Sequence, residues 1–370
     1  MSRVVVIGGG FAGLAAAETL RGKLDVLLID SKPTHDFLPM LPDVIGERAD
    51  PDLLVYDLAD LCRRLGAGFR LDPVTSVDLT ERRVVTGTGE ADYDYLVIAS
   101  GSRTTFYGQN AIRERARKLD DVADARTIAD MVRKDDREAY VVVGGAYTGI
   151  EVATNLRAFF DKHPPDRRVV VCELQDRLVP ALPERFQRYV TENVKRLGIE
   201  LRLKDTVDEI DDGTVRLASG ERIDHAAVIW SAGVRTPDFV QDLDVPKSKQ
   251  GRLEVDRCLR LDDRAFAAGD SALFVHGGGP LRMSIQFALS QGARAAKNIL
   301  RIDKGKPPEP FRPHDPGYII PMANNRSCGR ILGINCYGRM PTLAHYMMCI
   351  ARSRGMRRRL KMFADLRRIL

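Results

Sequence analysis

The order of apolar runs, glycine turns and amphipathic segments along the chain predicts two copies of one β-α-β unit. In the first copy, the strand-like run RVVVI (3–7) leads into glycines, a helix-like segment and a second apolar run, DVLLID (25–30). The same order recurs between residues 139 and 173, and the two turns begin 136 residues apart, at Gly8 and Gly144. Strands that alternate with helices are typical of a parallel sheet, so we expect an α/β fold containing a domain-scale repeat.

The first glycine turn carries a complete G-x-G-x-x-G pattern at Gly8, Gly10 and Gly13, and Asp30 ends the following strand 22 residues after Gly8. Glycines at these positions permit a tight turn, close approach of a pyrophosphate and close helix packing. The acid accepts a hydrogen bond from a ribose hydroxyl, and the helix N-terminus attracts the phosphates. The pattern therefore predicts a dinucleotide site rather than a turn that serves folding alone.

The second turn has Gly144, Ala146 and Gly149, with Glu173 at the ribose position. The methyl group of Ala146 lies where the pyrophosphate approaches, so we expect either a small backbone shift or weaker binding. A vestigial unit kept only for folding is the alternative. Glu173 repels a 2′-phosphate, which favours NAD over NADP, although Arg177 lies nearby in the sequence.

Composition narrows the class of protein. The 370 residues are 44% hydrophobic and 29% charged, which is typical of a folded soluble protein with two or three domains. No apolar run approaches the roughly 18–20 residues of a membrane-spanning helix. The glycines between residues 4 and 20 do not suit a secretory signal, so export is not expected. Six cysteines form no C-x-x-C pair, which predicts neither a disulfide framework nor a metal site.

Positive charge is concentrated at the C-terminal end. Residues 352–370 contain eight Lys or Arg and one Asp, so this tail carries +7 and the rest of the chain carries −1. Apolar residues recur in the tail at helical spacing: Met356, Leu360, Phe363, Leu366 or Arg367, and Leu370. We expect a basic amphipathic helix on an anionic membrane surface. A helix docked at a subunit interface is the alternative, and nucleic acid is not expected because aromatic residues do not interleave the basic ones.

Three motifs that follow the first glycine turn indicate a resemblance to a known family. The segments YDYLVIASGS (93–102), VIWSAGV (228–234) and FAAGDSA (266–272) follow the first turn in the order found in flavoproteins with two dinucleotide-binding domains, which the chain resembles over about 300 residues. The resemblance implies FAD at the first turn, with Asp270 at the ribityl chain or phosphate and the backbone of Val74 at the adenine. It also implies that the helix expected at 284–300 points its N-terminus at the flavin N1/C2=O edge, where negative charge develops on reduction.

The same resemblance assigns residues to each nucleotide. Expected FAD contacts are Gly8, Gly10, Phe11, Ala12, Gly13, Asp30, Ser31, Lys32, Pro39, Val74, Ser100, Gly101, Gly269 and Asp270. Expected NAD contacts are Gly144, Ala146, Tyr147, Gly149, Glu173 and Gly233. We predict a discontinuous FAD-binding domain (1–110 and 255–310), an NAD(H)-binding domain (111–254) and a C-terminal domain (311–370) that carries the basic helix.

One branch of these flavoproteins matches better than the others. The stretch HDFLPMLPDVIGE (35–47) lacks the redox cysteine pair of the dithiol-disulfide reductases and resembles the H-x-F-x-P-L-L stretch of type II NADH:quinone oxidoreductases. That resemblance places Phe37, Pro39, Met40 and Leu41 near the flavin. It places Glu151 of GGAYTGIE by the nicotinamide, and Gln286 and Gln291 on the quinone-site helix, where Ile285 and Ser290 depart from the family pattern. These three residues, Glu151, Gln286 and Gln291, are the predicted catalytic residues.

The resemblance implies a ping-pong cycle from NADH through FAD to a membrane quinone, without proton pumping. It also implies a peripheral homodimer on the cytoplasmic side of the cell membrane. A sulfide:quinone oxidoreductase that uses Cys328 and Cys336 is one alternative, because Ala146 departs from the glycine pattern. Two further alternatives are an NADH-binding flavoprotein that signals through its basic tail, and a soluble reductase for a small iron-sulfur protein.

Overall fold

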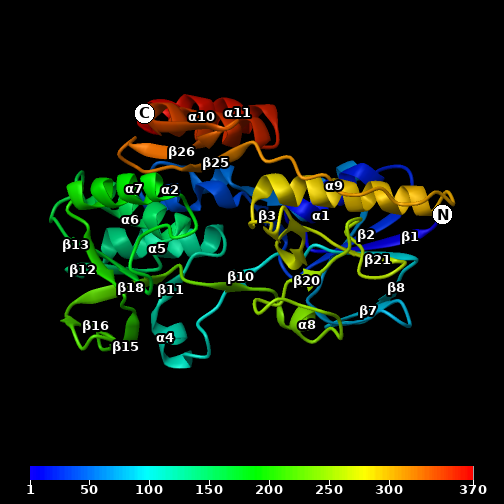
Figure 1. Cartoon of the computed structure of the whole chain (residues 1–370), viewed down its shortest axis with the longest axis horizontal. Coiled ribbons are helices and arrows are strands. Elements are labelled where there is room, and N and C mark those ends of the chain that lie inside the picture. The colour runs from blue at the N-terminus through cyan, green and yellow to red at the C-terminus, as the bar shows by residue number, and fades with distance from the viewer. Residues whose placement is uncertain (370) are drawn as a thin grey trace. The chain divides into compact units, whose positions relative to one another are not determined.

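The computed structural model describes residues 1–369, and the chain forms two compact units (Figure 1). Unit 1 comprises Met1–Asp36, Tyr56–Arg103 and Val234–Asp315, and unit 2 comprises Phe37–Val55, Thr104–Gly233 and the residues from Pro316 onward. The short segment 37–55 and the C-terminal segment therefore belong to unit 2. The functional division into an FAD-binding and an NAD(H)-binding domain stays a prediction.

Unit 1 is built on a five-stranded parallel sheet in the order β21-β9-β1-β2-β5. The central strands are apolar runs whose residues are buried on both faces, as a parallel sheet between two layers requires. The sheet strands are β1 (Arg3–Ile7), β2 (Asp25–Asp30), β5 (Gly68–Leu71), β9 (Tyr95–Ile98) and β21 (Ala265–Ala267). The other strands are β3 (Thr34–Asp36), β4 (Val55–Asp57), β6 (Val74–Asp78), β7 (Arg83–Thr86), β8 (Glu90–Asp92), β10 (Arg103–Thr104), β19 (Val234–Arg235), β20 (Leu253–Glu254), β22 (Ala272–Leu273), β23 (Val275–His276) and β24 (Gly279–Pro280).

The two faces of this sheet carry different layers. Helices α1 (Phe11–Leu20), α3 (Leu58–Leu65) and α9 (Ile285–Ile302) cover one face, and Figure 1 shows α9, in yellow, running beside α1. The small antiparallel sheet β6-β7-β8 and helix α8 (Asp238–Gln241) cover the other. Successive residues of β1 supply both cores, because Val4 and Val6 face the helices while Val5 and Ile7 face the small sheet.

Unit 2 repeats this plan with the strand order β11-β18-β12-β13-β14. Its sheet strands are β11 (Arg117–Lys118), β12 (Ala139–Val143), β13 (Arg168–Glu173), β14 (Glu200–Leu203) and β18 (Ala226–Trp230). Helices α5 (Val122–Lys134), α6 (Tyr147–Phe160) and α7 (Glu184–Arg196) cover one face. The sheet of β15 (Val207–Asp211), β16 (Thr214–Leu217) and β17 (Arg222–Ile223), with α4 (Asn110–Arg115), covers the other. The predicted α/β repeat is thus confirmed.

The C-terminal segment adds a hairpin sheet and two helices to unit 2. Strands β25 (Gly317–Ile320), β26 (Ser327–Ile331) and β27 (Ile334–Gly338) form the antiparallel sheet, and α10 (Arg339–Arg352) and α11 (Met356–Ile369), in red in Figure 1, lie side by side next to it. Short helix α2 (Leu41–Ile45) of the 37–55 segment contacts α5 and α6. Within residues 1–369, no helix has both the length and the hydropathy needed to cross a bilayer.

Only part of the apolar face expected on α11 is exposed to solvent. Met356, Leu360 and Phe363 are exposed, at 68%, 63% and 56%. Leu366, which the helical spacing places on the same face, is instead buried, because it faces the protein together with Met362. Leu370 and the side chains of Arg367 and Arg368 lie outside the described part of the chain.

Candidate functional site

The first glycine turn joins β1 to α1 with a backbone that only glycine permits. Gly8 has φ +103°, and a Cβ there would lie 2.3 Å from the Ala99 carbonyl oxygen. A Cβ on Gly13 would lie 1.8 Å from the Gly8 oxygen. A Cβ on Gly10, in contrast, would meet no described protein atom within 4 Å. Gly8 and Gly13 are therefore required by the protein itself, whereas the space beside Gly10 is open to a ligand.

The Asp30 carboxylate closes this turn from the end of β2. Its two oxygens accept hydrogen bonds from the Gly9 N–H at 2.6 Å and the Lys32 N–H at 2.9 Å. Burial raises the pKa of Asp30, and these two donors oppose that shift. Helix α1 has no side-chain cap and no acid in its first turn, an arrangement that suits phosphate oxygens at a helix N-terminus.

A second cluster in unit 1 gathers around the turn after β21. Ser102 Oγ donates to Asp270 Oδ2 at 2.8 Å, while burial raises the pKa of Asp270. The adjacent Gly269 has φ +72°, and its N–H donates to Gln291 Oε1 at 2.8 Å. A Cβ on Gly292 would lie 2.0 Å from the Ala12 oxygen, so α9 lies directly against the first turn of α1. The cluster fixes an acid beside the dinucleotide turn.

The two glutamines of α9 occupy different surroundings. Gln291 is only 1% exposed, and its amide oxygen already accepts the Gly269 N–H. This contact favours a role in shaping the Gly269–Asp270 turn over the predicted contact with a quinone. Gln286 is half-buried and is the second residue of the helix. Ser284 is the N-cap residue, as expected, but its buried Oγ makes no cap bond and has no partner among the described atoms.

The turn between β12 and α6 reproduces the first one closely. Gly144 has φ +107°, and a Cβ on Gly149 would lie 1.7 Å from the Gly144 oxygen. Ala146 has φ −84° and ψ −165°, compared with −74° and −168° at Gly10. Ala146 therefore keeps the backbone of a functional turn, and the expected backbone shift is small. The alanine adds only its methyl group to the open space.

Glu173 closes the second turn as Asp30 closes the first. Its oxygens accept from the Gly145 N–H at 2.6 Å and the Gln175 N–H at 2.9 Å. Arg177 was the nearby residue that could have bound the 2′-phosphate of NADP. It pairs instead with the neighbouring Asp176 at 2.5 Å.

The end of β18 completes the second site. Ser231 Oγ donates to the Val143 oxygen at 2.8 Å, and a Cβ on Gly144 would lie 3.1 Å from the Ala232 nitrogen. The chain runs from β12 to β13 on one side, while β18 flanks β12 on the other. Dinucleotides bind in the crevice at such a switch point, outside the carboxyl ends of the strands. The predicted NAD residues, Gly233 included, all lie in unit 2.

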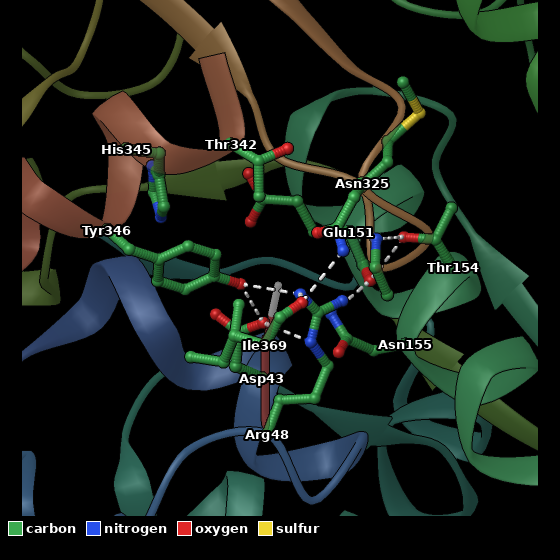
Figure 2. A network of polar contacts seen from close by, with 12 residues as sticks. Asp43, Arg48, Glu151, Thr154, Asn155, Asn325, Thr342, His345, Tyr346 and Ile369 are labelled. Atoms are coloured by element: carbon green, nitrogen blue, oxygen red, sulfur yellow. Dashed lines mark hydrogen bonds and ion pairs between the residues drawn. The ribbon is translucent and has the colours of Figure 1, made fainter. Parts of the chain in front are cut away.

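Glu151 projects from α6 into a set of buried polar side chains from α2 and α10 (Figure 2). Burial raises the pKa of Glu151 well above its usual value, and the Asp43 carboxylate adds to the shift. Tyr346 donates to Asp43 Oδ1 at 2.7 Å, and the Arg48 guanidinium lies 3.8 Å from the same oxygen. His345 is buried beside them, which lowers its pKa. Glu151 therefore holds its proton to higher pH than an exposed glutamate does.

Sequence reasoning missed Asp43, Arg48, His345 and Tyr346. Asp43 interrupts an apolar stretch, MLPDVIG. A lone acid in such a stretch indicates a buried carboxylate that needs polar partners, and this pattern could have revealed the cluster. The same segment contains Pro39, which belongs to unit 2, whereas every other predicted FAD residue lies in unit 1.

The cysteines of the sulfide-oxidising alternative do not form a pair. Cys328 on β26 lies opposite Tyr337 of β27, while Cys336 lies opposite Gly329. Neighbouring residues of a strand point to opposite faces, so the two thiols lie on different sides of the sheet. Burial raises the pKa of Cys328 to about 12, which suppresses its thiolate. Both cysteines are free and buried. Over the described residues, no group of three or more His, Cys, Asp or Glu side chains could hold a metal ion.

Comparison with known proteins agrees with this geometry. The chain is 25% identical to a type II NADH:quinone oxidoreductase of Staphylococcus haemolyticus, over 91% of each chain. It is 32% identical to an NADH dehydrogenase-like protein of Mycobacterium tuberculosis, over 74% of this chain and 73% of that one. Its fold matches NDH2 from Plasmodium falciparum in complex with NADH, with a TM-score of 0.88, 16% identity, and coverage of 98% and 97%. The family resemblance drawn from the motifs is confirmed, since the sequence profile of the pyridine nucleotide-disulphide oxidoreductases matches residues 2–292 and the chain belongs to that family.

Proposed function

We propose that this chain is a type II NADH:quinone oxidoreductase that binds FAD in unit 1 and NADH in unit 2. The observation that carries the proposal is the pair of dinucleotide turns, each with its left-handed glycine and its acid bonded to the turn. Relatives that match nine-tenths of the chain and bear that name support the choice of reaction.

The residues of unit 1 fit FAD. The open space at Gly10 and the uncapped start of α1 suit a pyrophosphate, and Asp30 suits the adenosine ribose. Asp270 suits the ribityl chain, and the uncapped start of α9 suits the electron-rich edge of the flavin. When bound, the flavin would accept reducing equivalents from NADH and pass two electrons to a quinone.

The residues of unit 2 bind and orient NADH and hold a proton. Gly144, Ala146 and Gly149 form the pyrophosphate turn, and Glu173 selects an unphosphorylated ribose. Quinone reduction consumes two protons. Glu151 is suited to store one of them, because its surroundings favour the protonated carboxyl.

Exposed apolar side chains on α10 and α11 support attachment to a membrane surface. Met340, Leu343 and Met347 of α10 are 51%, 43% and 43% exposed, and Met356, Leu360 and Phe363 of α11 are exposed as well. The exposed Arg357 and Lys361 flank them. An apolar face rimmed by basic residues binds anionic lipid from one side of the bilayer. The proposed site of action is therefore the cytoplasmic face of the cell membrane, where we also propose a homodimer.

Anaerobic rapid mixing tests the proposal. The purified protein should be yellow, NADH should bleach the flavin within one turnover, and a soluble quinone should restore the colour at a matching rate. A protein that stays colourless after reconstitution with FAD overturns the proposal. So does a flavin that NADH reduces but no quinone reoxidises.

A further inference from the structure

Tyr107 covers the glycine that ends the second dinucleotide crevice. A Cβ on Gly233 would lie 2.0 Å from Tyr107 Oη and 2.5 Å from its Cζ, so the phenol end of the ring rests on the bare face of this glycine. The rest of the side chain is open, with 67% of Tyr107 exposed. The Tyr107 ring is therefore held at one edge by Gly233 and is accessible to a ligand on the rest of its surface.

The local structure holds Tyr107 in this position. Phe106 packs on Trp230 with ring centroids 5.3 Å apart, and Trp230 Nε1 donates to the Thr105 oxygen at 3.0 Å. The Thr105 N–H donates to the Gly233 oxygen at 3.2 Å. Tyr107 itself has φ +51°, a left-handed conformation that residues with a Cβ rarely adopt.

The first unit lacks an equivalent cover. Gly101 follows β9 as Gly233 follows β18, and the two have similar φ angles of +69° and +76°. A Cβ on Gly101 would meet no described protein atom within 4 Å. The repeat thus predicts open space at Gly233, and Tyr107 fills it only in the unit whose dinucleotide must enter and leave at each turnover.

The position of Tyr107 selects one end of the dinucleotide. Glu173 follows β13 and holds the adenosine ribose, whereas Gly233 follows β18 on the other side of β12. A dinucleotide that crosses the Gly144 turn from Glu173 therefore reaches Gly233 with its pyridine half. Aromatic rings bind flat heterocycles by stacking or edge contact.

We propose that Tyr107 is a positioning residue that contacts the pyridine half of NAD(H) and orients it in unit 2. This inference rests on the proposed binding of NADH in that unit. It adds a residue to the substrate site that the glycine motif does not contain.

Calorimetric titration with two ligands tests the contact. NAD⁺ contains the pyridine ring and ADP-ribose does not, while both contain the adenosine and the pyrophosphate. In Tyr107→Ala we expect the Kd for NAD⁺ to rise about fivefold or more and the Kd for ADP-ribose to change less than about twofold. Tyr107→Phe keeps the ring and should stay within about threefold of the wild type for NAD⁺.

Gln109→Ala is the matched control, because Gln109 is exposed in the same loop and its side chain makes no cap bond to α4. It should leave both dissociation constants unchanged. Equal changes for NAD⁺ and ADP-ribose in Tyr107→Ala, or tighter NAD⁺ binding, overturn the inference while leaving NADH binding in unit 2 intact. A wild-type protein that binds neither ligand overturns both this inference and the NADH step of the proposed function.

Discussion

Gly8 and Gly144 adopt φ angles of +103° and +107°, and each donates its N–H at 2.8 Å to the neighbouring strand. Asp30 and Glu173 accept from the turns at the same distance, 2.6 Å. The two units differ in two respects: Ala146 stands where the first turn has Gly10, and Tyr107 covers Gly233, whereas no described atom lies within 4 Å of a Cβ on Gly101. The glycines and acids that shape the two turns are thus the same in kind, and the residues that differ lie beside the space proposed for the dinucleotide.

This difference suits two dinucleotides with different residence times. A resident cofactor needs an open turn and many contacts that slow its release. A substrate that leaves at each turnover needs selection without excessive affinity, because binding the substrate and the transition state equally does not raise kcat. The Ala146 methyl group at the pyrophosphate and the Tyr107 ring at the pyridine end suit a substrate that leaves at each turnover.

The largest effect is expected where a side chain would collide with the turn itself. Gly13→Ala places its Cβ 1.8 Å from a backbone oxygen, so it should cost about 3 kcal/mol or more in unfolding free energy and abolish flavin binding. Gly149→Ala meets the same collision in unit 2, at 1.7 Å. It should abolish NAD⁺ binding and leave a yellow protein. Flavin absorbance and calorimetric titration with NAD⁺ separate the two variants.

A soluble Gly13→Ala protein with full flavin content would contradict the equivalence of the two turns. The same holds for a Gly149→Ala protein that binds NAD⁺ normally. Neither Gly13 nor Gly149 has a positive φ, so the loss expected in both variants comes from the collision. Gly22→Ala is the converse control, because Gly22 has φ +66° and its added Cβ meets no described atom within 4 Å, so it shows the cost of backbone strain without a collision.

A smaller effect is expected where only the ligand would meet the new methyl group. Gly10→Ala makes the first turn resemble the second, and the Cβ meets no described protein atom within 4 Å. We expect unchanged thermal stability of the flavin-free protein and FAD binding weakened about tenfold, or about 1.4 kcal/mol. Fluorescence titration of the flavin-free protein with FAD measures both the affinity and the stoichiometry. A fall in the Tm of the flavin-free protein would show that the protein, not the ligand, requires this glycine.

Asp270 of unit 1 and Glu151 of unit 2, both partly buried, offer a comparison by pH. Burial raises the pKa of both Asp270 and Glu151, but Ser102 and Arg252 oppose the shift at Asp270, whereas Asp43 increases it at Glu151. The folded chain thus keeps a proton on Glu151 that the unfolded chain releases. The free energy of unfolding therefore falls as pH rises from the usual pKa of 4.5 to the raised one.

Glu151→Gln removes this titration, so its Tm should fall less than the wild-type Tm as pH rises from about 5 to 7. Asp43→Asn removes the like charge, lowers the pKa of Glu151 and should shorten the pH interval over which stability is lost. Thermal melts across a pH series measure both effects. Parallel wild-type and Glu151→Gln curves would show that Glu151 ionises normally in the folded chain.

The sequence predicted the parts of the site that depend on local pattern. The turns could be found because glycine spacing, strand and helix are neighbours in the chain, and the acids because the second strand has a regular length. The Asp43–Tyr346 contact could not, since it joins residues 303 positions apart through the packing of α2 against the C-terminal segment. Leu366 was placed on the exposed face of α11 for a similar reason, because periodicity alone does not reveal which side of a helix meets the protein.

The smallest predicted effect concerns the residue that distinguishes the two turns. Ala146→Gly removes the methyl group from a backbone that already matches Gly10, so no rearrangement is needed. We expect NAD⁺ to bind about two- to fivefold more tightly, with flavin content unchanged. If product release limits turnover, the tighter complex should also lower kcat while it lowers KM for NADH. An unchanged Kd in Ala146→Gly would mean that the pyrophosphate does not approach the turn as closely in unit 2 as the glycine pattern requires. The resemblance between the two turns would then be one of backbone shape alone.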